Sequence, residues 1–229
     1  MLNPWLNFES ASAVKSGEYL HDLDKAQVVM YNLKARSDSR KLLTHMLPEP
    51  WAGAIDAPVV VLQGNPGANE DEARLDWRPT AAQRQAALAT LAGEKLDYPL
   101  YWLDPKLSST DGGRWSEQRL KKLIEAAGRD SVSRSLLLLE TYAYHSRQFA
   151  SRITSLPTQQ YTDYLLQQAI ARDALVVIVR SKKYWMEKVP ALAEHEMRGL
   201  VLTTSSWQNA SLSPGNLKAG YELLLSRLR

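Results

Sequence analysis

The sequence predicts an α/β fold in three layers, with a mostly parallel, four-stranded sheet and helices on both of its faces. Two observations carry this prediction. Three short, strongly apolar runs are typical of strands buried on both faces, and a shorter run near the C-terminus adds a fourth strand. Segments with helical spacing separate these runs, and strands that alternate with helices pair in parallel through right-handed crossovers. The strands are expected at residues 58–62, 135–139, 174–179 and 200–203.

Helices are expected to fill most of the chain between these strands. Pro79 stands near the start and Gly93 at the end of the first clear helix, as helices commonly begin and stop. Ser213 is a candidate N-cap for the last helix, with Pro214 in its first turn. The expected helices are 79–93, 115–127, 159–172, 181–187 and 214–228; residues 51–53 and 108–113 are expected as loops and residues 98–103 as an extended segment.

The length of 229 residues suits one domain, since single hydrophobic cores stop growing at about 250–300 residues. Residues 1–47 have mixed helical spacing, and Pro48 and Pro50 end that segment because each proline disfavours the helical conformation in the residue before it. We therefore expect a single domain over residues 1–229, with residues 1–47 packed as a helical segment on a core of residues 48–229.

The composition excludes several classes of site. The chain has no cysteine, so disulfides, thiolate zinc sites and cysteine-held iron–sulfur clusters are excluded. Its four histidines are scattered, with no HExxH pair, so we expect neither a metal nor another cofactor.

The chain also lacks the signals of a membrane or exported protein. No apolar run approaches the roughly 18–20 residues that span a bilayer. The N-terminus lacks the basic and apolar regions of a signal peptide. A cytoplasmic protein without a membrane partner is expected, whereas the sequence does not define the oligomeric state.

The second part of the chain carries a net positive charge because acidic residues are fewer there. Residues 131–229 carry 12 Lys and Arg against 7 Asp and Glu. Such a surface could face the phosphates of a nucleic acid, or it could be an ordinary solvated surface. Both readings stay open for the short basic run at Arg180, Lys182 and Lys183.

The loop after the first strand is the first candidate ligand site. Residues 63–67 read Gln-Gly-Asn-Pro-Gly. Glycine allows the backbone to approach a ligand or to adopt a positive φ, and proline fixes the turn. Asn65 would then present its amide, which can hold a water or a carbonyl but cannot act as a base at neutral pH. A plain turn between a strand and a helix is the equally weighted alternative for Gln63, Gly64, Pro66 and Gly67.

The loop after the second strand is the second candidate. Glu140 follows a buried strand and could accept hydrogen bonds from a base, whereas Tyr142 and Tyr144 could stack. His145 could donate to a developing anion or hold a phosphate. The alternative reading places Glu140 at an exposed strand end and both tyrosines in the core.

A third candidate loop, rich in hydroxyls and amides, follows the last strand. Short polar side chains suit phosphate contacts, and a wedge residue could fill a gap in a base stack. Its candidate DNA-binding residues are Ser206, Trp207, Gln208 and Asn209. The alternative is a capping loop whose serines satisfy backbone groups. Since ligands of parallel sheets bind outside the carboxyl ends of the strands, the three loops are expected to share one edge.

The order of these pieces resembles the uracil-DNA glycosylase superfamily. Its members place a Gly-x-Asn-Pro-Gly or Gly-Gln-Asp-Pro-Tyr loop after the first core strand, then a Leu-Leu-Leu-Asn-type strand end, and a His-Pro-Ser-type loop before the last helix. Here residues 64–67 resemble the first motif, residues 137–140 the second, and residues 204–209 stand where the third belongs. The resemblance covers roughly residues 47–229.

Four positions depart from the family's pattern. Gln63 stands for the first-motif glycine, Glu140 for the base-reading asparagine, Ser206 for the late histidine and Trp207 for the proline after it. Several members use asparagine to position the attacking water, so Asn65 is compatible with activity. The late histidine stabilises the departing base, and His145 is the candidate to replace it. The iron–sulfur members are excluded by the missing cysteines.

The resemblance implies a protein that binds DNA or another nucleic acid and excises a modified or mismatched base by hydrolysing its N-glycosidic bond. By analogy, the base would be flipped into a pocket between residues 63–67 and 140–145, and residues 204–213 would press on the backbone. One alternative is a glycosylase fold without catalysis that binds nucleic acid, a nucleotide or a protein. A different α/β enzyme acting on a small nucleotide is another.

Overall fold

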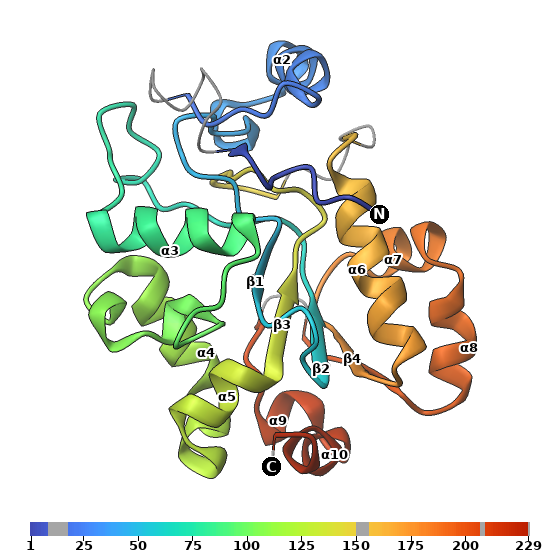
Figure 1. Ribbon diagram of the computed structural model, residues 1–229. Helices are drawn as coiled ribbons and strands as arrows, with labels where there is room; N and C mark the ends of the chain where they lie inside the picture. The colour runs from blue at the N-terminus through green and yellow to red at the C-terminus, as the bar shows by residue number, and fades with distance from the viewer. Residues whose placement is uncertain (9–17, 150–155, 207–208, 229) are drawn as a thin grey trace. The chain divides into compact units, whose positions relative to one another are not determined.

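The computed structural model describes residues 1–8, 18–149, 156–206 and 209–228. The chain divides into two compact units, each built from segments far apart in the sequence (Figure 1). The first unit comprises Met1–Trp51, Gly64–Glu94 and Glu140–Thr162, and the second comprises Ala52–Gln63, Lys95–Leu139 and Asp163–Arg229. The single domain stays a prediction, and each unit is described by itself below.

The second unit contains nearly all of a five-stranded sheet, so the fold is α/β. The strands are β1 (Trp51–Gly53), β2 (Val59–Leu62), β3 (Leu136–Leu139), β4 (Leu175–Ile178) and β5 (Val201–Thr203). Their order in the sheet is β1-β3-β2-β4-β5. Strand β2 pairs in parallel with β3 and with β4, and β4 pairs in parallel with β5. All four residues of β2, of β3 and of β4 are buried, as their continuous apolar sequences predict.

The fifth strand, β1, corrects the prediction of a loop at 51–53. Pro50 accepts a hydrogen bond from the amide of Glu140, whereas Gly53 lies against the carbonyl of Leu136. Strands β1 and β3 therefore run in opposite directions, and the sheet is mixed. Gly53 has a φ of +116° and a Cβ there would collide with the carbonyl, so only glycine fits. Three residues are too few to show the pattern of a strand. Strand β1 forms through its pairing with β3, which is distant in sequence, so local sequence does not predict it.

Helices of the second unit lie to both sides of the strands in the view of Figure 1, with α4 and α5 on one side and α7 and α8 on the other. The helices are α4 (Asp111–Ala127), α5 (Arg129–Ser135), α7 (Lys182–Lys188), α8 (Ala191–Met197), α9 (Pro214–Leu217) and α10 (Gly220–Ser226). Helix α8 contacts β5, and α10 contacts α4. The border between the units falls within α6 (Gln159–Ala171).

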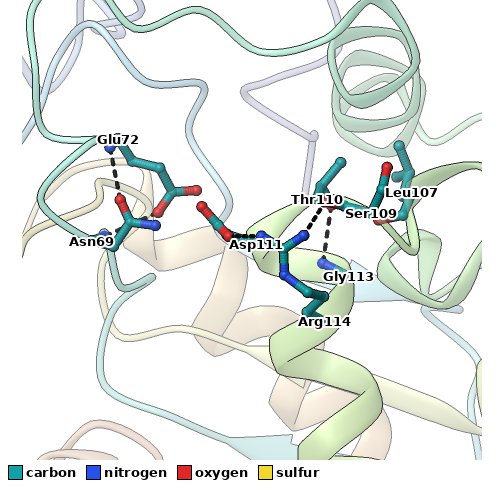
Figure 2. A network of polar contacts seen from close by, with 8 residues as sticks. All are labelled: Asn69, Glu72, Leu107, Ser109, Thr110, Asp111, Gly113 and Arg114. Carbon is teal, nitrogen blue, oxygen red and sulfur yellow. Dashed lines mark hydrogen bonds and ion pairs between the residues drawn. The ribbon is translucent and has the colours of Figure 1, made fainter.

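Helix α4 begins at Asp111, inside the segment expected as a loop. Thr110 is its N-cap, and its hydroxyl accepts a hydrogen bond from the amide of Gly113 at 3.1 Å (Figure 2). The guanidinium of Arg114 pairs with Asp111 and donates to the carbonyl of Ser109. Capping by threonine and an acidic first turn both stabilise a helix start, but two consecutive glycines in that turn hide the helix from a propensity argument.

Three further expectations for the second unit need correction. Residues 98–103 are not extended, since Tyr101–Leu103 forms a 3-10 turn, η3, followed by a second one, η4 (Pro105–Leu107). The last helix is two helices, because Lys218 has a φ of +51° and interrupts it between α9 and α10. Ser213 is the N-cap of α9 and Pro214 lies in its first turn, as expected, but the Ser213 side chain makes no capping bond. Helices α5 and α8 were not expected, and each has only seven residues.

The first unit contains α2 (Lys25–Lys34), the short turn η2 (Asp38–Arg40) and α3 (Ala81–Ala92). Helix α3 confirms the helix expected at 79–93. Thr80 and Gln83 form a reciprocal capping box at its start, and Gly93 ends it with a φ of +73°. Just after the first candidate loop, the side chain of Asn69 accepts from the amide of Glu72, and the side chain of Glu72 accepts from the amide of Asn69 (Figure 2). These two hydrogen bonds hold the acidic stretch in a turn.

Candidate functional site

The first unit brings together the loops that follow β2 and β3. The amide of Thr141 donates to the carbonyl of Gly64 at 2.7 Å. Further along, the amide of Ser146 donates to the carbonyl of Pro66 at 3.1 Å, and the amide of Ala68 donates back to Ser146 at 3.2 Å. Two adjacent parallel strands thus continue as two adjacent loops. The predicted proximity of residues 64–67 and 140–145 is present within this unit.

Asn65 is the side chain that ties the two loops together. Its amide nitrogen lies 3.1 Å from the carbonyl oxygen of Tyr144, 2.9 Å from the hydroxyl of Ser146 and 3.1 Å from the carbonyl of Pro66. An amide has only two protons, so these three acceptors share them. No residue that the structure describes donates to Oδ1 of Asn65, which is half-buried. The NH₂ group is fixed, and the oxygen is left to accept a hydrogen bond from a ligand or a water.

An aromatic ring covers the backbone beside Asn65. A Cβ at Gly64 would lie 2.8 Å from the ring of Phe149, so glycine is needed there for close packing and not for its φ. The rings of Phe149 and Tyr142 are stacked, with centroids 6.1 Å apart. A Cβ at Gly67 would meet nothing within 4 Å. Only one of the two glycines is therefore required by the surrounding protein.

His145 is buried, with 8% of its surface exposed. Its Nδ1 lies 2.8 Å from the carbonyl oxygen of Gly67, and its backbone carbonyl accepts from the amide of Leu43. Burial lowers the pKa of His145 to about 4, although the carbonyls of Gly67 and Leu47 act in the opposite direction. The ring is therefore neutral at pH 7 and holds the first loop. A role for His145 toward a ligand stays a prediction.

Tyr144 lies in the core, which agrees with the alternative interpretation of this residue as a core side chain. It is fully buried, and its hydroxyl donates to a carboxylate oxygen of Asp24 at 2.8 Å. Burial, followed by the charge of Asp24, raises the pKa of Tyr144. Asp24 also accepts from the hydroxyl of Thr158 at 2.6 Å and from its amide at 3.1 Å. This carboxylate joins two segments of the first unit that are distant in sequence, and no local sequence pattern indicates it.

Glu140 is buried rather than exposed at the strand end. It has 7% of its surface exposed, and its amide donates to the carbonyl of Pro50. The next residue, Thr141, is held by Gln159, whose side-chain amide donates to its carbonyl. The base-reading role of Glu140 stays a prediction.

The third candidate loop belongs to the second unit, and one buried side chain organises it. Asn216 accepts hydrogen bonds from the hydroxyl of Ser205 and the amide of Ser206, and it donates to the carbonyls of Asn209 and Ser211. The hydroxyl of Ser206 and the side chain of Asn209 each accept from a backbone amide of the same loop. These contacts match the alternative of a loop that satisfies itself. Trp207 and Gln208 lie outside the described residues.

The strand order marks another place in the second unit. After β2 the chain continues to β3 on one side, and after β4 it continues to β5 on the other. Adjacent strands with diverging connections form the switch point at which open parallel sheets bind ligands. Val179 and Arg180 follow β4 there and donate backbone hydrogen bonds to Leu62 at the end of β2. The indole of Trp185 donates to the carbonyl of Gln63 at 3.0 Å, which fixes the start of the first loop.

Two polar side-chain atoms at this switch point are buried without a partner. They are Nε of Arg180 and Oγ of Ser181, neither of which has a hydrogen bond to any residue that the structure describes. Ser181 has a φ of +59°, a left-handed conformation uncommon for serine. The neighbouring Lys182 and Lys183 form ion pairs with Glu196 and Glu187. Buried unpaired polar atoms cost free energy unless a ligand or water satisfies them.

Across the described parts of the chain, no group of three or more His, Cys, Asp or Glu side chains could hold a metal ion. No described helix combines the length and apolar character needed to cross a bilayer. Comparison with known protein families, curated proteins and solved structures finds nothing that matches this chain.

Proposed function

We propose that this protein is a divergent uracil-DNA-glycosylase-like protein that binds nucleic acid and excises a modified or mismatched base. The proposal includes the fold of that superfamily, which has three layers and a mostly parallel sheet. In the reaction, a water adds to C1′ of the deoxyribose as the N-glycosidic bond breaks. The bonding electrons leave with the base, which takes up a proton, and the water gives up a proton.

The geometry of Asn65 carries this proposal. Its NH₂ group is fixed by oxygens of the 140–146 loop and of its own loop, so its Oδ1 is held in one orientation. An amide oxygen held in this way can accept a hydrogen bond from an attacking water and orient it. Catalysis by orientation needs such preorganisation, because a mobile amide would lose part of the rate enhancement.

The unpaired atoms at the switch point support the nucleic-acid part of the proposal. Arg180 brings a positive charge and a buried donor to the carboxyl ends of β2 and β4, and Ser181 brings a hydroxyl. Guanidinium and hydroxyl groups are frequent phosphate contacts in protein–DNA complexes. In this proposal, Arg180 and Ser181 contact a phosphate of the nucleic-acid backbone.

A second candidate function is binding without catalysis. The burial of His145 and its contact with Gly67 favour it, because a histidine used in this way is not placed to stabilise a departing base. Ser206, in the position of the family's late histidine, likewise uses its hydroxyl within its own loop. On this alternative the protein binds nucleic acid, and no bond is broken.

An excision assay separates the two candidates. Labelled single- and double-stranded oligonucleotides that contain uracil, hypoxanthine or a mismatch are incubated with the protein and tested for alkali-labile abasic sites. We expect abasic sites from at least one substrate with the wild-type protein. Retained binding with no abasic site on any substrate selects the second candidate. Loss of both binding and excision rejects the proposal.

The variants must separate the orientation of water from the anchoring of the loop. Asn65→Ala removes both the oxygen and the three hydrogen bonds of the amide, whereas Ser146→Ala removes one of the acceptors and leaves the oxygen. We expect excision to fall at least a hundredfold in Asn65→Ala and less than tenfold in Ser146→Ala. Equal losses in both, at matched stability, would assign Asn65 to loop structure alone.

A further inference from the structure

Helix α2 turns an apolar stripe toward solvent. Leu33 has 76% of its surface exposed, Met30 49% and Val29 44%, and Ala26 is exposed as well. The buried residue of this helix is Val28. A surface helix of a globular protein normally buries its apolar face and exposes its polar one. Here the arrangement is the reverse.

The exposed side chains form two adjacent rows along the helix. Residues four apart lie above one another on a helix. One row is Lys25, Val29 and Leu33, and the other is Ala26, Met30 and Lys34. The apolar residues therefore make one continuous stripe with the spacing i, i+3, i+4, i+7. A lysine stands at each end of the stripe, on opposite edges.

The opposite face of α2 fixes the helix in this orientation. The side chain of Asn32 donates to the carbonyl of Leu42 at 2.9 Å and accepts from the amide of Leu42 at 2.8 Å. The hydroxyl of Tyr31 donates to the carbonyl of Arg40 at 3.1 Å, and Val28 is fully buried. The stripe cannot turn inward without breaking these contacts.

The charges around the stripe are mainly positive. Lys25, Lys34 and Arg36 are exposed, and none of them forms an ion pair with a residue that the structure describes. Asp22 is the exposed acid nearest in sequence, while Asp38 is paired with Lys41 at 2.7 Å. An apolar surface with unpaired cations at its edges is complementary to an apolar surface with carboxylates at its edges.

We propose that α2 is a docking site for an amphipathic helix of an acidic partner protein. This partner presents apolar residues at helical spacing, as in other helix-recognition modes. Lys25 and Lys34 are nine positions apart, or about 13 Å along the axis, so the partner carries carboxylates about that far apart.

Charge disfavours a second copy of this chain as the occupant. Two α2 helices packed antiparallel bring Lys25 of one copy to Lys34 of the other at both ends, and parallel packing brings like lysines together. Like charges across an interface suppress such pairing. An anionic membrane fits less well, because interfacial helices bear Trp, Phe or Leu over a wide face, and this stripe has a single Leu and no aromatic residue.

The test uses the full-length protein and a labelled synthetic peptide in a fluorescence-anisotropy titration at low salt. The peptide is helical, with leucines at positions i, i+3, i+4 and i+7 and glutamates flanking them nine positions apart. A second peptide has lysines in place of the glutamates. We expect the acidic peptide to bind at least tenfold more tightly than the basic one.

Two variants of the stripe and one control give the decisive comparison. Val29→Ser/Leu33→Ser is expected to weaken binding of the acidic peptide at least tenfold. Lys25→Glu/Lys34→Glu is expected to invert the preference, so that the basic peptide binds more tightly. Met197→Ser is the control, since Met197 is 82% exposed and lies on α8. Thermal unfolding checks that each variant remains folded.

Several outcomes would overturn the proposal. Equal affinity for the two peptides, or no effect of the stripe variants, removes the charge complementarity on which it rests. Dimers in sedimentation that dissociate in Val29→Ser/Leu33→Ser assign the stripe to a second copy. Binding to vesicles of phosphatidylserine and phosphatidylcholine, lost in the same variant and without peptide binding, assigns it to a membrane. We expect the stripe variants to leave excision and binding of oligonucleotides unchanged, so the two proposals fail separately.

Discussion

At the scale of single residues, the polar side chains of the candidate loops mostly hold backbone groups. The amide nitrogen of Asn65, the ring of His145 and the carboxylate of Asp24 each contact one or more segments distant in sequence. Buried polar groups must be paired, so such contacts stabilise the loops and also restrict what each side chain can do for a ligand. Of the three, Asn65 keeps an oxygen for that purpose.

The buried His145 predicts a pH dependence of stability. Its pKa is about 4 in the folded protein, below the ordinary value of 6.5. Between these values the unfolded chain binds a proton that the folded protein does not, so this residue lowers the free energy of unfolding as pH falls. We expect the stability difference between wild type and His145→Gln to shrink by about 2–3 kcal/mol from pH 7 to pH 4, measured by urea unfolding. A difference that stays constant with pH contradicts this.

The two glycines of the first loop predict opposite results for the same substitution. Gly64→Ala pushes a methyl group into the ring of Phe149, whereas Gly67→Ala meets open space. We expect Gly64→Ala to lower the free energy of unfolding by about 1–3 kcal/mol, and Gly67→Ala to leave it within about 0.5 kcal/mol. Phe149→Ala in the background of Gly64→Ala should relieve most of the clash. Similar losses at both glycines would show that Phe149 is not placed as described.

At the scale of elements, the apolar strands and α3 are the parts that sequence reasoning located well. Strands β2, β3 and β4 are buried on both faces, so nothing interrupts their apolar runs. By contrast, β1 depends on pairing with β3, and the start of α4 depends on the cap at Thr110. Such elements follow from contacts or caps rather than from periodicity, which explains why they were missed.

The same distinction applies to the candidate site. The adjacency of the loops after β2 and β3 followed from the parallel pairing of those strands. The roles of Asp24, Phe149 and Asn216 did not, since each acts on residues that are not its helical or strand neighbours. The sequence distance between Asp24 and Thr158 is 134 residues, so no local pattern could join them.

The loop before α9 predicts a large effect of one buried side chain. Asn216→Ala removes hydrogen bonds to four residues of the loop and leaves three backbone groups and the hydroxyl of Ser205 without these bonds. We expect a loss of about 2–3 kcal/mol of stability, measured by chemical unfolding. Asn209→Ala removes a single accepted bond at an exposed position and is expected to cost under about 1 kcal/mol. Equal effects would contradict the organising role of Asn216.

At the scale of the whole molecule, the pH dependence of stability combines groups with opposite signs. Burial raises the pKa of Asp163 from 3.8 to about 6, and the charge of Lys188 opposes this shift. Between these values the folded protein keeps a proton that the unfolded chain has lost, so Asp163 lowers stability as pH rises. His145 acts in the opposite direction over an overlapping range, and the wild-type profile is expected to be flatter than either contribution.

Substitution of Asp163 separates its contribution to the pH dependence of stability from that of His145. Asp163→Asn cannot ionise, so we expect it to exceed the wild type in stability at pH 7 by about 1–2 kcal/mol, after discounting for partial exposure. The gain should fall below about 1 kcal/mol at pH 4 and vanish below about pH 3, where the wild-type carboxyl is protonated in both states. Urea unfolding at several pH values gives the comparison. A gain that is the same at pH 4 and pH 7 would show that the charge of Asp163 is not its cause.

The central claim, that this protein binds nucleic acid, is tested most directly by a salt titration. The affinity for a labelled oligonucleotide is measured from low to high salt for the wild type and for Arg180→Ala. Each phosphate contact contributes about 0.7 to 0.9 to the slope of log affinity against log salt. We expect measurable binding that weakens steeply with salt, and a slope reduced by about one contact in Arg180→Ala. Absence of binding at low salt, or binding that does not depend on salt, would contradict the account.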